Sequence, residues 1–215
     1  MELNGKHAVL FDFDGVVIDT EGQYSQFWHQ VGVDYLGMTD LEGRIKGQTL
    51  VYIFDTYFAG QLAVQAAVTE RLTHFEQHMN YDYVPGVLDF IIDLQRRGIS
   101  TALVTSSNQA KMEAVYAVHP EVKSLFTHIL TSEMFAASKP DPDCFLLGMR
   151  ILGVCPENTY VFEDSLNGLR AGLASGAHVI GLATTHSREQ IAPFCHHILD
   201  DFINFDYDKL VCVHK

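Results

Sequence analysis

The sequence has few cysteines, little positive charge and no long hydrophobic run. Its 215 residues include four cysteines, at 144, 155, 195 and 212, with no close pair, so we expect neither a disulfide framework nor a tetrahedral zinc site, and a cytoplasmic protein. Fourteen basic residues face 27 acidic ones, a formal net charge of -13, which disfavours nucleic acid and anionic membranes as partners. No window reaches the roughly 18 apolar residues of a membrane span, and "MELNGKHAVLF" does not look like a signal peptide.

The composition and the order of apolar segments predict an α/β fold. Hydrophobic residues make up 47% of the chain and charged residues 19%, which is typical of a globular protein with a sizeable core. Apolar runs with strand character alternate with helix-like segments, and this predicts a Rossmann-like parallel sheet with helices on both faces. The predicted strands span 7–13, 100–106, 127–130, 159–164 and 177–183, and the predicted helices 86–98, 108–119, 141–153 and 165–176. Ligands bind beyond the carboxyl ends of the strands in such sheets.

One interval interrupts the alternation. Between the first strand and the helix at 86–98 the sequence carries only helical stretches, over roughly 60 residues, which is far too long for a simple connection. We therefore predict an inserted all-helical cap domain at 20–83, with 1–19 and 84–215 forming the catalytic core. Pro85-Gly86 favours a turn followed by a helix start and marks the return to the core.

The first predicted strand ends in two aspartates. Asp12 and Asp14 in "VLFDFDG" are two positions apart, and the period of a strand points both side chains the same way. For a lone pair of this kind, a solvated strand end is the simpler interpretation. Two carboxylates that face one another also raise each other's pKa and invite a divalent cation, and Gly15 permits a close approach by a ligand.

The next predicted core strand ends in hydroxyl side chains. Thr105, Ser106 and Ser107 precede Asn108, near which a helix should begin, and Ser107 is expected to be its N-cap. Hydroxyls and free backbone N–H groups at a helix N-terminus also form an anion site. The segment is therefore compatible with phosphate binding, although helix capping alone would account for it.

Two later segments supply a cation and further acids. Lys139 lies between Ser138 and two prolines that stiffen the chain, so its ammonium could be fixed at the sheet edge to bind a phosphate, or it could be a solvated loop charge. Glu163 and Asp164 end another predicted strand. Adjacent acids at this position suit either an acidic helix start or the oxygen ligands of Mg²⁺.

The four segments are more informative together than singly. Each lies at a predicted strand end or in the turn that follows, so all four should open onto the same edge of the sheet. They combine carboxylates for a metal, hydroxyl and amide donors, and one lysine, which is the inventory of a phosphoryl-transfer site. The lysine and the metal would also allow an acidic protein to bind an anionic substrate.

A resemblance to a known family rests on these four motifs. They are DxDG at 12–15, Thr105, Lys139 in "SKP" and "ED" at 163–164. The sequence resembles the haloacid dehalogenase-like hydrolase superfamily over nearly the whole chain. Its helical insert resembles the cap of the subgroup that includes β-phosphoglucomutase and many sugar-phosphate phosphatases. The resemblance implies a Mg²⁺-dependent phosphatase that hydrolyses a small phosphate monoester, a sugar phosphate by class, through an aspartyl-phosphate intermediate.

The resemblance also assigns roles. Asp12 would be the nucleophile, and Asp14 the general acid to the leaving oxygen and then the base for water. Mg²⁺ would be held by Asp12, the backbone carbonyl of Asp14 and Asp164, with Glu163 nearby. Residues of the second and third motifs would bind the substrate and its phosphoryl group, namely Thr105, Ser106, Ser107, Asn108 and Lys139.

The acid two positions after the nucleophile separates the reactions of the superfamily. Its dehalogenases and phosphonatases lack an aspartate there, so Asp14 favours phosphate ester chemistry. The β-phosphoglucomutases carry a histidine and an arginine where this sequence has Tyr24 and Leu50. A phosphatase is therefore favoured, with a β-phosphoglucomutase-type mutase as the alternative. A catalytically inactive binding domain would have lost an essential motif residue, and all of them are present.

Charged residues in the predicted cap are candidates for substrate binding. Arg44 and Lys46 could face the site and contact the distal part of the substrate, although exposed charges at a helix end would explain them equally well. Because a cap can shield the site unaided, we expect a monomer whose partner is a phosphorylated small molecule.

Overall fold

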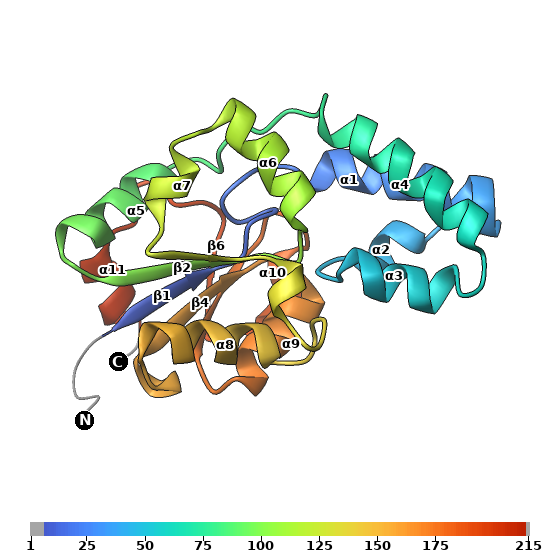
Figure 1. Cartoon of the computed structure of the whole chain (residues 1–215). Coiled ribbons are helices and arrows are strands. Elements are labelled where there is room, and N and C mark those ends of the chain that lie inside the picture. Colours follow the sequence, from blue (N-terminus) through green and yellow to red (C-terminus); the bar gives the residue numbers. More distant parts are fainter. Residues whose placement is uncertain (1–6, 214–215) are drawn as a thin grey trace.

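The structure is a computed structural model that describes residues 7–213, and its core is a parallel sheet covered by helices on both faces (Figure 1). Within these residues six strands pair in the order β3-β2-β1-β4-β5-β6, and all neighbours are parallel. The strands are β1 Ala8–Phe11, β2 Ser100–Val104, β3 His128–Leu130, β4 Thr159–Glu163, β5 His178–Leu182 and β6 His197–Leu199. The predicted Rossmann-like α/β core is confirmed.

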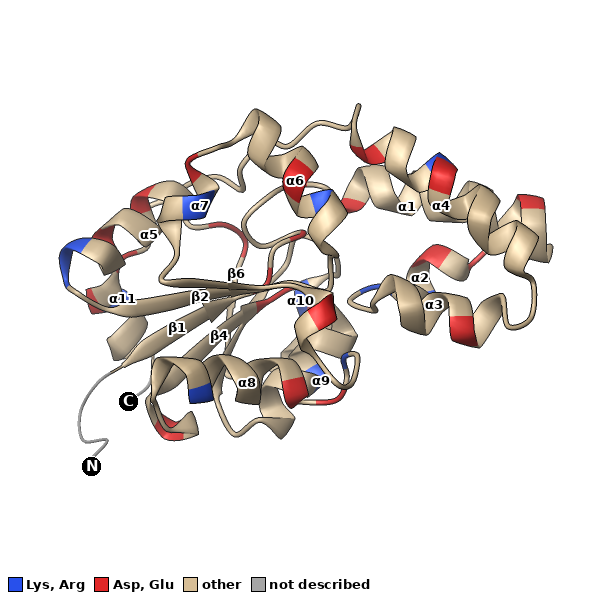
Figure 2. Cartoon of the chain, viewed as in Figure 1, with Lys and Arg blue, Asp and Glu red and all other residues tan. Residues whose placement is uncertain are grey.

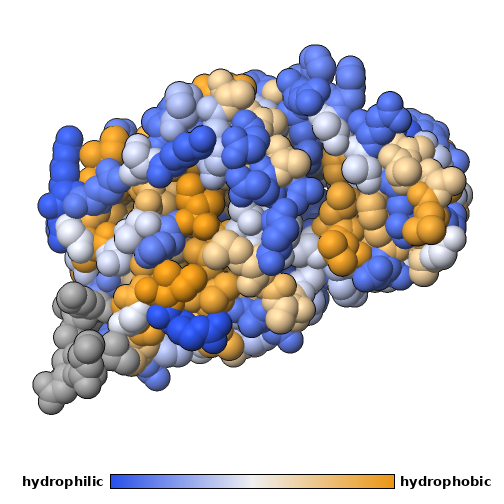
Figure 3. All heavy atoms as spheres, in the orientation of Figure 1, coloured by the Kyte–Doolittle hydropathy of each residue, from blue (hydrophilic) through white to orange (hydrophobic). Residues whose placement is uncertain are grey.

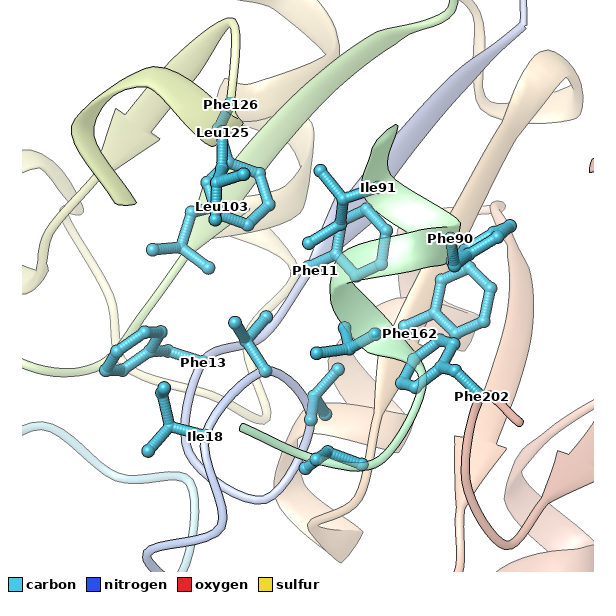
Figure 4. Close-up of a cluster of buried hydrophobic side chains, with 14 of the residues drawn as sticks. Phe11, Phe13, Ile18, Phe90, Ile91, Leu103, Leu125, Phe126, Phe162 and Phe202 are labelled. Atoms are coloured by element: carbon cyan, nitrogen blue, oxygen red, sulfur yellow. The ribbon is translucent and has the colours of Figure 1, made fainter. Parts of the chain in front are cut away.

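The central strand β1 is apolar throughout because both faces of the sheet are covered. Its four residues are fully buried. Phe11 packs in one hydrophobic cluster with Phe90 and Phe162 (Figure 4), whereas Leu10 packs in a second cluster with Phe145. Successive side chains of a strand point to opposite faces of the sheet. The same alternation sets the direction in which the side chains just after β1 point.

The helices of the core lie in two layers. They are α5 Val87–Arg96, α6 Gln109–Val118, α7 Val122–Leu125, α8 Asp143–Leu152, α9 Leu166–Ala174, α10 Arg188–Ile191 and α11 Tyr207–Cys212. In Figure 1, α5, α6 and α7 lie on one side of the sheet, and α8 and α9 on the other. The two hydrophobic clusters lie between these layers and the sheet.

The start of α6 corrects one prediction. The N-cap is Asn108, whose side chain accepts a hydrogen bond from the backbone N–H of Lys111 at 2.9 Å, so the prediction of Ser107 was wrong. Asn108 is the last residue in an extended conformation, and the cap must occupy that position. The Ser107 hydroxyl instead donates to Asp14 at 3.0 Å.

A second unit lies between β1 and α5. Its helices are α1 Glu21–Val31, α2 Leu41–Ile45, α3 Leu50–Tyr57 and α4 Leu62–Glu76, and a π-helical turn, Gly32–Leu36, continues α1. They enclose a separate hydrophobic core of Phe27, Trp28, Val31, Leu41, Ile45, Ile53, Phe58, Val68 and Leu72. In Figure 1 this unit lies beyond the carboxyl ends of the strands. We propose that it is the cap with the predicted bounds 20–83; residues 1–6 and 214–215 of the predicted core lie outside the described residues.

Hydrophobic residues reach the surface only in separate groups on the face that Figure 3 draws. None of the helices in the described part of the chain is both long enough and apolar enough to span a bilayer. On the face drawn in Figure 3, hydrophobic residues form several groups, over the core and over the cap, with hydrophilic residues between them.

Candidate active site

The motif residues converge where the strands end toward the cap, and Figure 2 shows acidic positions at that edge. Asp12 directly follows β1, and its backbone N–H donates to the carbonyl of Phe162 in β4 at 3.0 Å. Lys139 is 1% exposed. Its Nζ lies 2.7 Å from Asp12 Oδ1 and 2.6 Å from Glu163 Oε1. Three residues that lie far apart in the sequence therefore form one buried charge cluster.

Glu163 is surrounded by hydrogen-bond donors. Its Oε2 accepts from the backbone N–H groups of Asp164 and Ser165, both at 2.9 Å, and from the Ser165 hydroxyl at 3.0 Å. With Lys139 on Oε1, both oxygens are occupied within the protein. We infer that Glu163 fixes Lys139 and the turn that carries Asp164.

Asp12, Glu163 and Asp164 could together hold a metal ion. One carboxylate oxygen from each lies within 4.8 Å of the others, and all three side chains are buried. Burial raises the pKa of Asp164 well above its usual value, and neighbouring acids such as Glu21 add to the shift. Three buried acids beside the single ammonium of Lys139 leave an excess of negative charge, which suits a divalent cation with oxygen ligands.

Gly15 allows the two acidic segments to meet. Its φ is +76°, and a Cβ at this position would lie 2.1 Å from Asp164 Oδ2. Glycine adopts this left-handed backbone conformation without strain, and it has no Cβ that would clash with Asp164. The turn after Asp14 can therefore touch the turn after β4 only because residue 15 has no side chain.

The metal-free protein is expected to lose stability as the pH rises from about 4 to about 7. Burial is the main cause that raises the pKa of Asp12 from 3.8 to about 7, while Lys139 opposes the shift. Since the folded state favours the protonated carboxyl, this stabilisation is complete below the unfolded pKa and is lost as the pH rises through the folded pKa. The expected loss is roughly 2–4 kcal/mol.

Thermal unfolding in EDTA between about pH 5 and pH 8 measures this loss. Asp12→Asn should reduce the pH dependence, because the amide does not titrate in this range, and the slope that remains comes from other buried acids such as Asp164. Asp55→Asn replaces an exposed acid on α3 and should keep the wild-type slope. An equal slope in the Asp12→Asn protein would contradict the prediction.

Asp14 is held by three donors. The Lys111 ammonium donates to both of its carboxylate oxygens, the Thr20 hydroxyl donates to Oδ1, and the Ser107 hydroxyl donates to Oδ2. Lys111 is only 3% exposed, and its Nζ lies 4.4 Å from the centroid of the Tyr24 ring. The carboxylate of Asp14 is therefore fixed in orientation by side chains from the core and from the start of the cap.

The cap loop after α2 contacts the core directly. The Ser106 hydroxyl donates to the carbonyl of Gly47 at 2.9 Å, and Asn167 Nδ2 donates to the carbonyl of Lys46 at 2.8 Å. The backbone N–H of Thr49 donates to Ser138 Oγ at 3.0 Å. These bonds hold the cap against the carboxyl edge of the sheet.

A cavity of about 110 Å³ lies between the cap and the core. Of the predicted site residues, seven line it, namely Asp12, Asp14, Lys46, Ser106, Ser107, Asn108 and Asp164. Thr105 lies beside it, 1% exposed, and its hydroxyl accepts from the backbone N–H of Ser107 at 3.0 Å. The volume suits a small substrate.

The two cap cations are placed differently. Lys46 lines the cavity, pairs with Glu21 and donates to Ser25 at 3.1 Å. Arg44 is not among the cavity residues; its exposed guanidinium pairs with Asp40, four residues earlier, at 2.7 Å. The structure thus brings Lys46 to the site and does not bring Arg44 there.

Three charged residues of the cavity, Glu21, Glu76 and Lys111, were not predicted from the sequence. Lys111 lies on α6 and Glu76 ends α4, and both line the cavity although neither belongs to a motif. The Tyr24 hydroxyl donates to Glu76 Oε1 at 2.8 Å. A single charge on a helix carries no sequence signal of its burial.

Comparison with known proteins establishes the family. A model of the haloacid dehalogenase-like hydrolases matches residues 6–176, which is most of the chain. The chain belongs to the haloacid dehalogenase-like hydrolases. It is therefore a member of an enzyme family, and the resemblance recognised in its motifs is confirmed.

Proteins similar to this haloacid dehalogenase-like hydrolase include a named phosphatase and a solved mutase. It is 29% identical to protein CbbY of Cereibacter sphaeroides, over 91% of this chain and 92% of the relative. It is 30% identical to hexitol phosphatase A of Escherichia coli, over 80% and 81%. A solved β-phosphoglucomutase from Clostridium difficile superposes with a TM-score of 0.82 over 98% of this chain and 97% of its own. The identity of that pair is 18%, so the likeness concerns the fold alone.

Proposed function

We propose that this haloacid dehalogenase-like hydrolase is a Mg²⁺-dependent phosphatase that hydrolyses a small sugar phosphate through an aspartyl-phosphate on Asp12. The observation that carries the proposal is that Asp12 and Asp14 line the same cavity. Asp12 accepts a hydrogen bond from Lys139, and Asp14 accepts hydrogen bonds from three side chains. The name of the relative hexitol phosphatase A supports a phosphorylated sugar or polyol as the substrate class.

The first half of the reaction forms the phosphoenzyme. A carboxylate oxygen of Asp12 attacks phosphorus, and the bond between phosphorus and the alcohol oxygen breaks. Asp14, in its protonated form, gives its proton to the departing oxygen, which leaves as a neutral alcohol. Lys139 holds Asp12 in place and contributes positive charge where the phosphoryl group transfers.

The second half releases phosphate and restores both acids. A water molecule attacks phosphorus, the bond to Asp12 breaks, and the Asp14 carboxylate accepts the proton of the water. Lys111, Thr20 and Ser107 orient this carboxylate for the step in which it accepts the proton. Asp14 ends the cycle protonated, as it began.

The acidic cluster fits a divalent ion by its donor chemistry. Asp12 and Asp164 would be the side-chain ligands, while Glu163, already bonded to Lys139 and the following turn, would orient them. Bound there, Mg²⁺ would neutralise charge between the nucleophile and the phosphate. The approach of an anionic substrate to Asp12 would otherwise be opposed by repulsion between like charges.

The function is tested by phosphate release from a panel of sugar phosphates in the presence of Mg²⁺. We expect release from at least one hexose or pentose phosphate, its loss in EDTA, and its return with excess Mg²⁺. Turnover that survives EDTA would contradict the metal dependence. Conversion of β-glucose 1-phosphate to glucose 6-phosphate without phosphate release would establish a mutase instead.

Asp14→Asn is expected to lower kcat/KM for sugar phosphates by about 10²–10⁴-fold, because the alcohol oxygen then leaves without a proton. The loss on acetyl phosphate should be much smaller, since acetate is a stable leaving group. The ratio of the two values of kcat/KM measures the first half of the reaction. Asp19→Asn, at an exposed neighbouring position, serves as the control. Equal losses on both substrates would argue against the role of Asp14 as an acid.

A further inference from the structure

The cap side of the cavity combines an apolar wall with one buried carboxylate. The wall is formed by Trp28, Ile45, Leu50, Ile53 and Leu72. Glu76, the last residue of α4, lines the same cavity and is 9% exposed. A carboxylate is costly to bury unless hydrogen-bond donors or positive charge compensate it.

Glu76 has an oxygen without a donor. Oε1 accepts from the Tyr24 hydroxyl at 2.8 Å, and the Tyr81 hydroxyl bonds to the backbone carbonyl of Glu76 at 2.6 Å. Among residues 7–213 no group donates a hydrogen bond to Oε2, and no cation lies within 4.0 Å of the carboxylate. The side chain is thus held by its neighbours and offers an acceptor to whatever fills the cavity.

Lys111 is a second charged neighbour of Tyr24. Its ammonium lies over the Tyr24 ring and is bonded to Asp14, and its charge opposes the rise that burial causes in the pKa of Glu76. A hydroxyl group suits the exposed oxygen of this carboxylate, because it donates a hydrogen bond without adding charge to the cavity. A phosphate or carboxylate placed there would be repelled by Glu76.

The charges of the whole cavity also disfavour a second anionic group on the substrate. Five acids line it, namely Asp12, Asp14, Glu21, Glu76 and Asp164, against two lysines, Lys46 and Lys111. Lys46 is paired with Glu21, and Lys111 with Asp14. A divalent ion and the reacting phosphate would occupy the floor of the cavity, so the cap side offers, among residues 7–213, no unpaired lysine or arginine to a second anionic group.

We propose that Glu76 determines substrate specificity, because its carboxylate accepts a hydrogen bond from a hydroxyl of the alcohol part and disfavours any substrate with a second phosphate. The proposal rests on the phosphatase function above and adds a rule about the substrate. Monophosphates of uncharged polyols and sugars are accepted, and bisphosphates are bound more weakly.

Two substitutions separate charge from hydrogen bonding. Glu76→Gln keeps an acceptor oxygen and removes the charge, whereas Glu76→Met removes both at similar length. The substrates are fructose 6-phosphate, fructose 1,6-bisphosphate and acetyl phosphate, which has no hydroxyl. Glu70→Gln, at an exposed position on the same helix, is the matched control.

In the wild type, kcat/KM for the monophosphate should exceed that for the bisphosphate by at least about 10-fold. Glu76→Gln should reduce this ratio to a few-fold, and Glu70→Gln should leave it unchanged. Glu76→Met should lower kcat/KM for fructose 6-phosphate by about 10–100-fold, mainly through KM, with a several-fold smaller loss on acetyl phosphate. Equal losses on both substrates, or an unchanged ratio in Glu76→Gln, would overturn the proposal.

A binding measurement separates this proposal from the phosphatase function. Calorimetry with the Asp12→Asn protein and Mg²⁺ compares the two fructose phosphates without turnover. Tighter binding of the monophosphate, with the difference reduced by adding Glu76→Gln, supports the specificity role even if the wild type releases no phosphate. Binding of neither ligand, or tighter binding of the bisphosphate, overturns it.

Discussion

Replacing Asp12 with asparagine is expected to lower phosphate release by on the order of 10⁴-fold or more. The amide oxygen is a poor nucleophile, so no covalent phosphoenzyme forms at this position. The loss should appear in kcat/KM for sugar phosphates and acetyl phosphate alike, because both substrates need the same attacking oxygen. This pattern differs from that expected for Asp14→Asn, which spares acetyl phosphate.

The fold should survive this substitution. Asparagine has nearly the shape of aspartate, and Lys139 keeps its bond to Glu163 Oε1 at 2.6 Å. Circular dichroism and thermal unfolding check the fold, and mass spectrometry after acid quenching checks whether wild-type Asp12 carries phosphate. Asp55→Asn, exposed on α3, should keep wild-type turnover. Residual activity of Asp12→Asn above about 1% of wild type would place the nucleophile elsewhere.

The motif residues could be found from the sequence because local structure alone fixes them. Asp12 and Asp164 each follow a buried parallel strand directly, and the carboxyl ends of such strands share one edge. Lys139 follows a short connection from β3, and its place at the site needs only the sheet order. The four motifs therefore predicted, without knowledge of distances, the edge of the sheet at which these residues meet.

Residues that tertiary packing buries gave no such signal. Lys111 is a charged residue in the first turn of α6, yet it is 3% exposed because its side chain lies against Asp14. Glu76 ends a cap helix with weak amphipathic character. Which charges a helix buries depends on the partner it meets, and a sequence pattern does not contain that partner. The same holds for α2, whose five residues, Leu41–Ile45, are too few to show helical periodicity.

The buried lysines explain how an acidic hydrolase can handle phosphate. The net charge of -13 acts over the surface and is screened within about 10 Å at ordinary salt. Lys139 and Lys111 are 1% and 3% exposed and act at contact distance on Asp12 and Asp14. Local charge at the site therefore matters more for substrate binding than the overall sign.

Gly168→Ala is expected to destabilise the protein by about 3 kcal/mol or more. Gly168 lies in the first turn of α9, and its backbone N–H donates to Ser165 Oγ at 3.0 Å. A Cβ there would lie 1.8 Å from Glu163 Oε1 and 2.3 Å from Oε2. Glu163 cannot yield, because Lys139 holds one oxygen and three donors hold the other.

The Gly168→Ala substitution should also lower activity, because it displaces the carboxylate of Glu163. Displacing Glu163 moves Lys139, which also holds Asp12, so activity at a temperature where the variant is folded should fall as well. The melting temperature should drop by roughly 6–12 °C. Gly22→Ala is the matched control: it lies in α1, where a Cβ meets nothing within 4 Å, and a gain of up to about 1 kcal/mol is expected. A Gly168→Ala protein within about 0.5 kcal/mol of the wild type would show that Glu163 has room to move, and that it does not fix Lys139 as inferred.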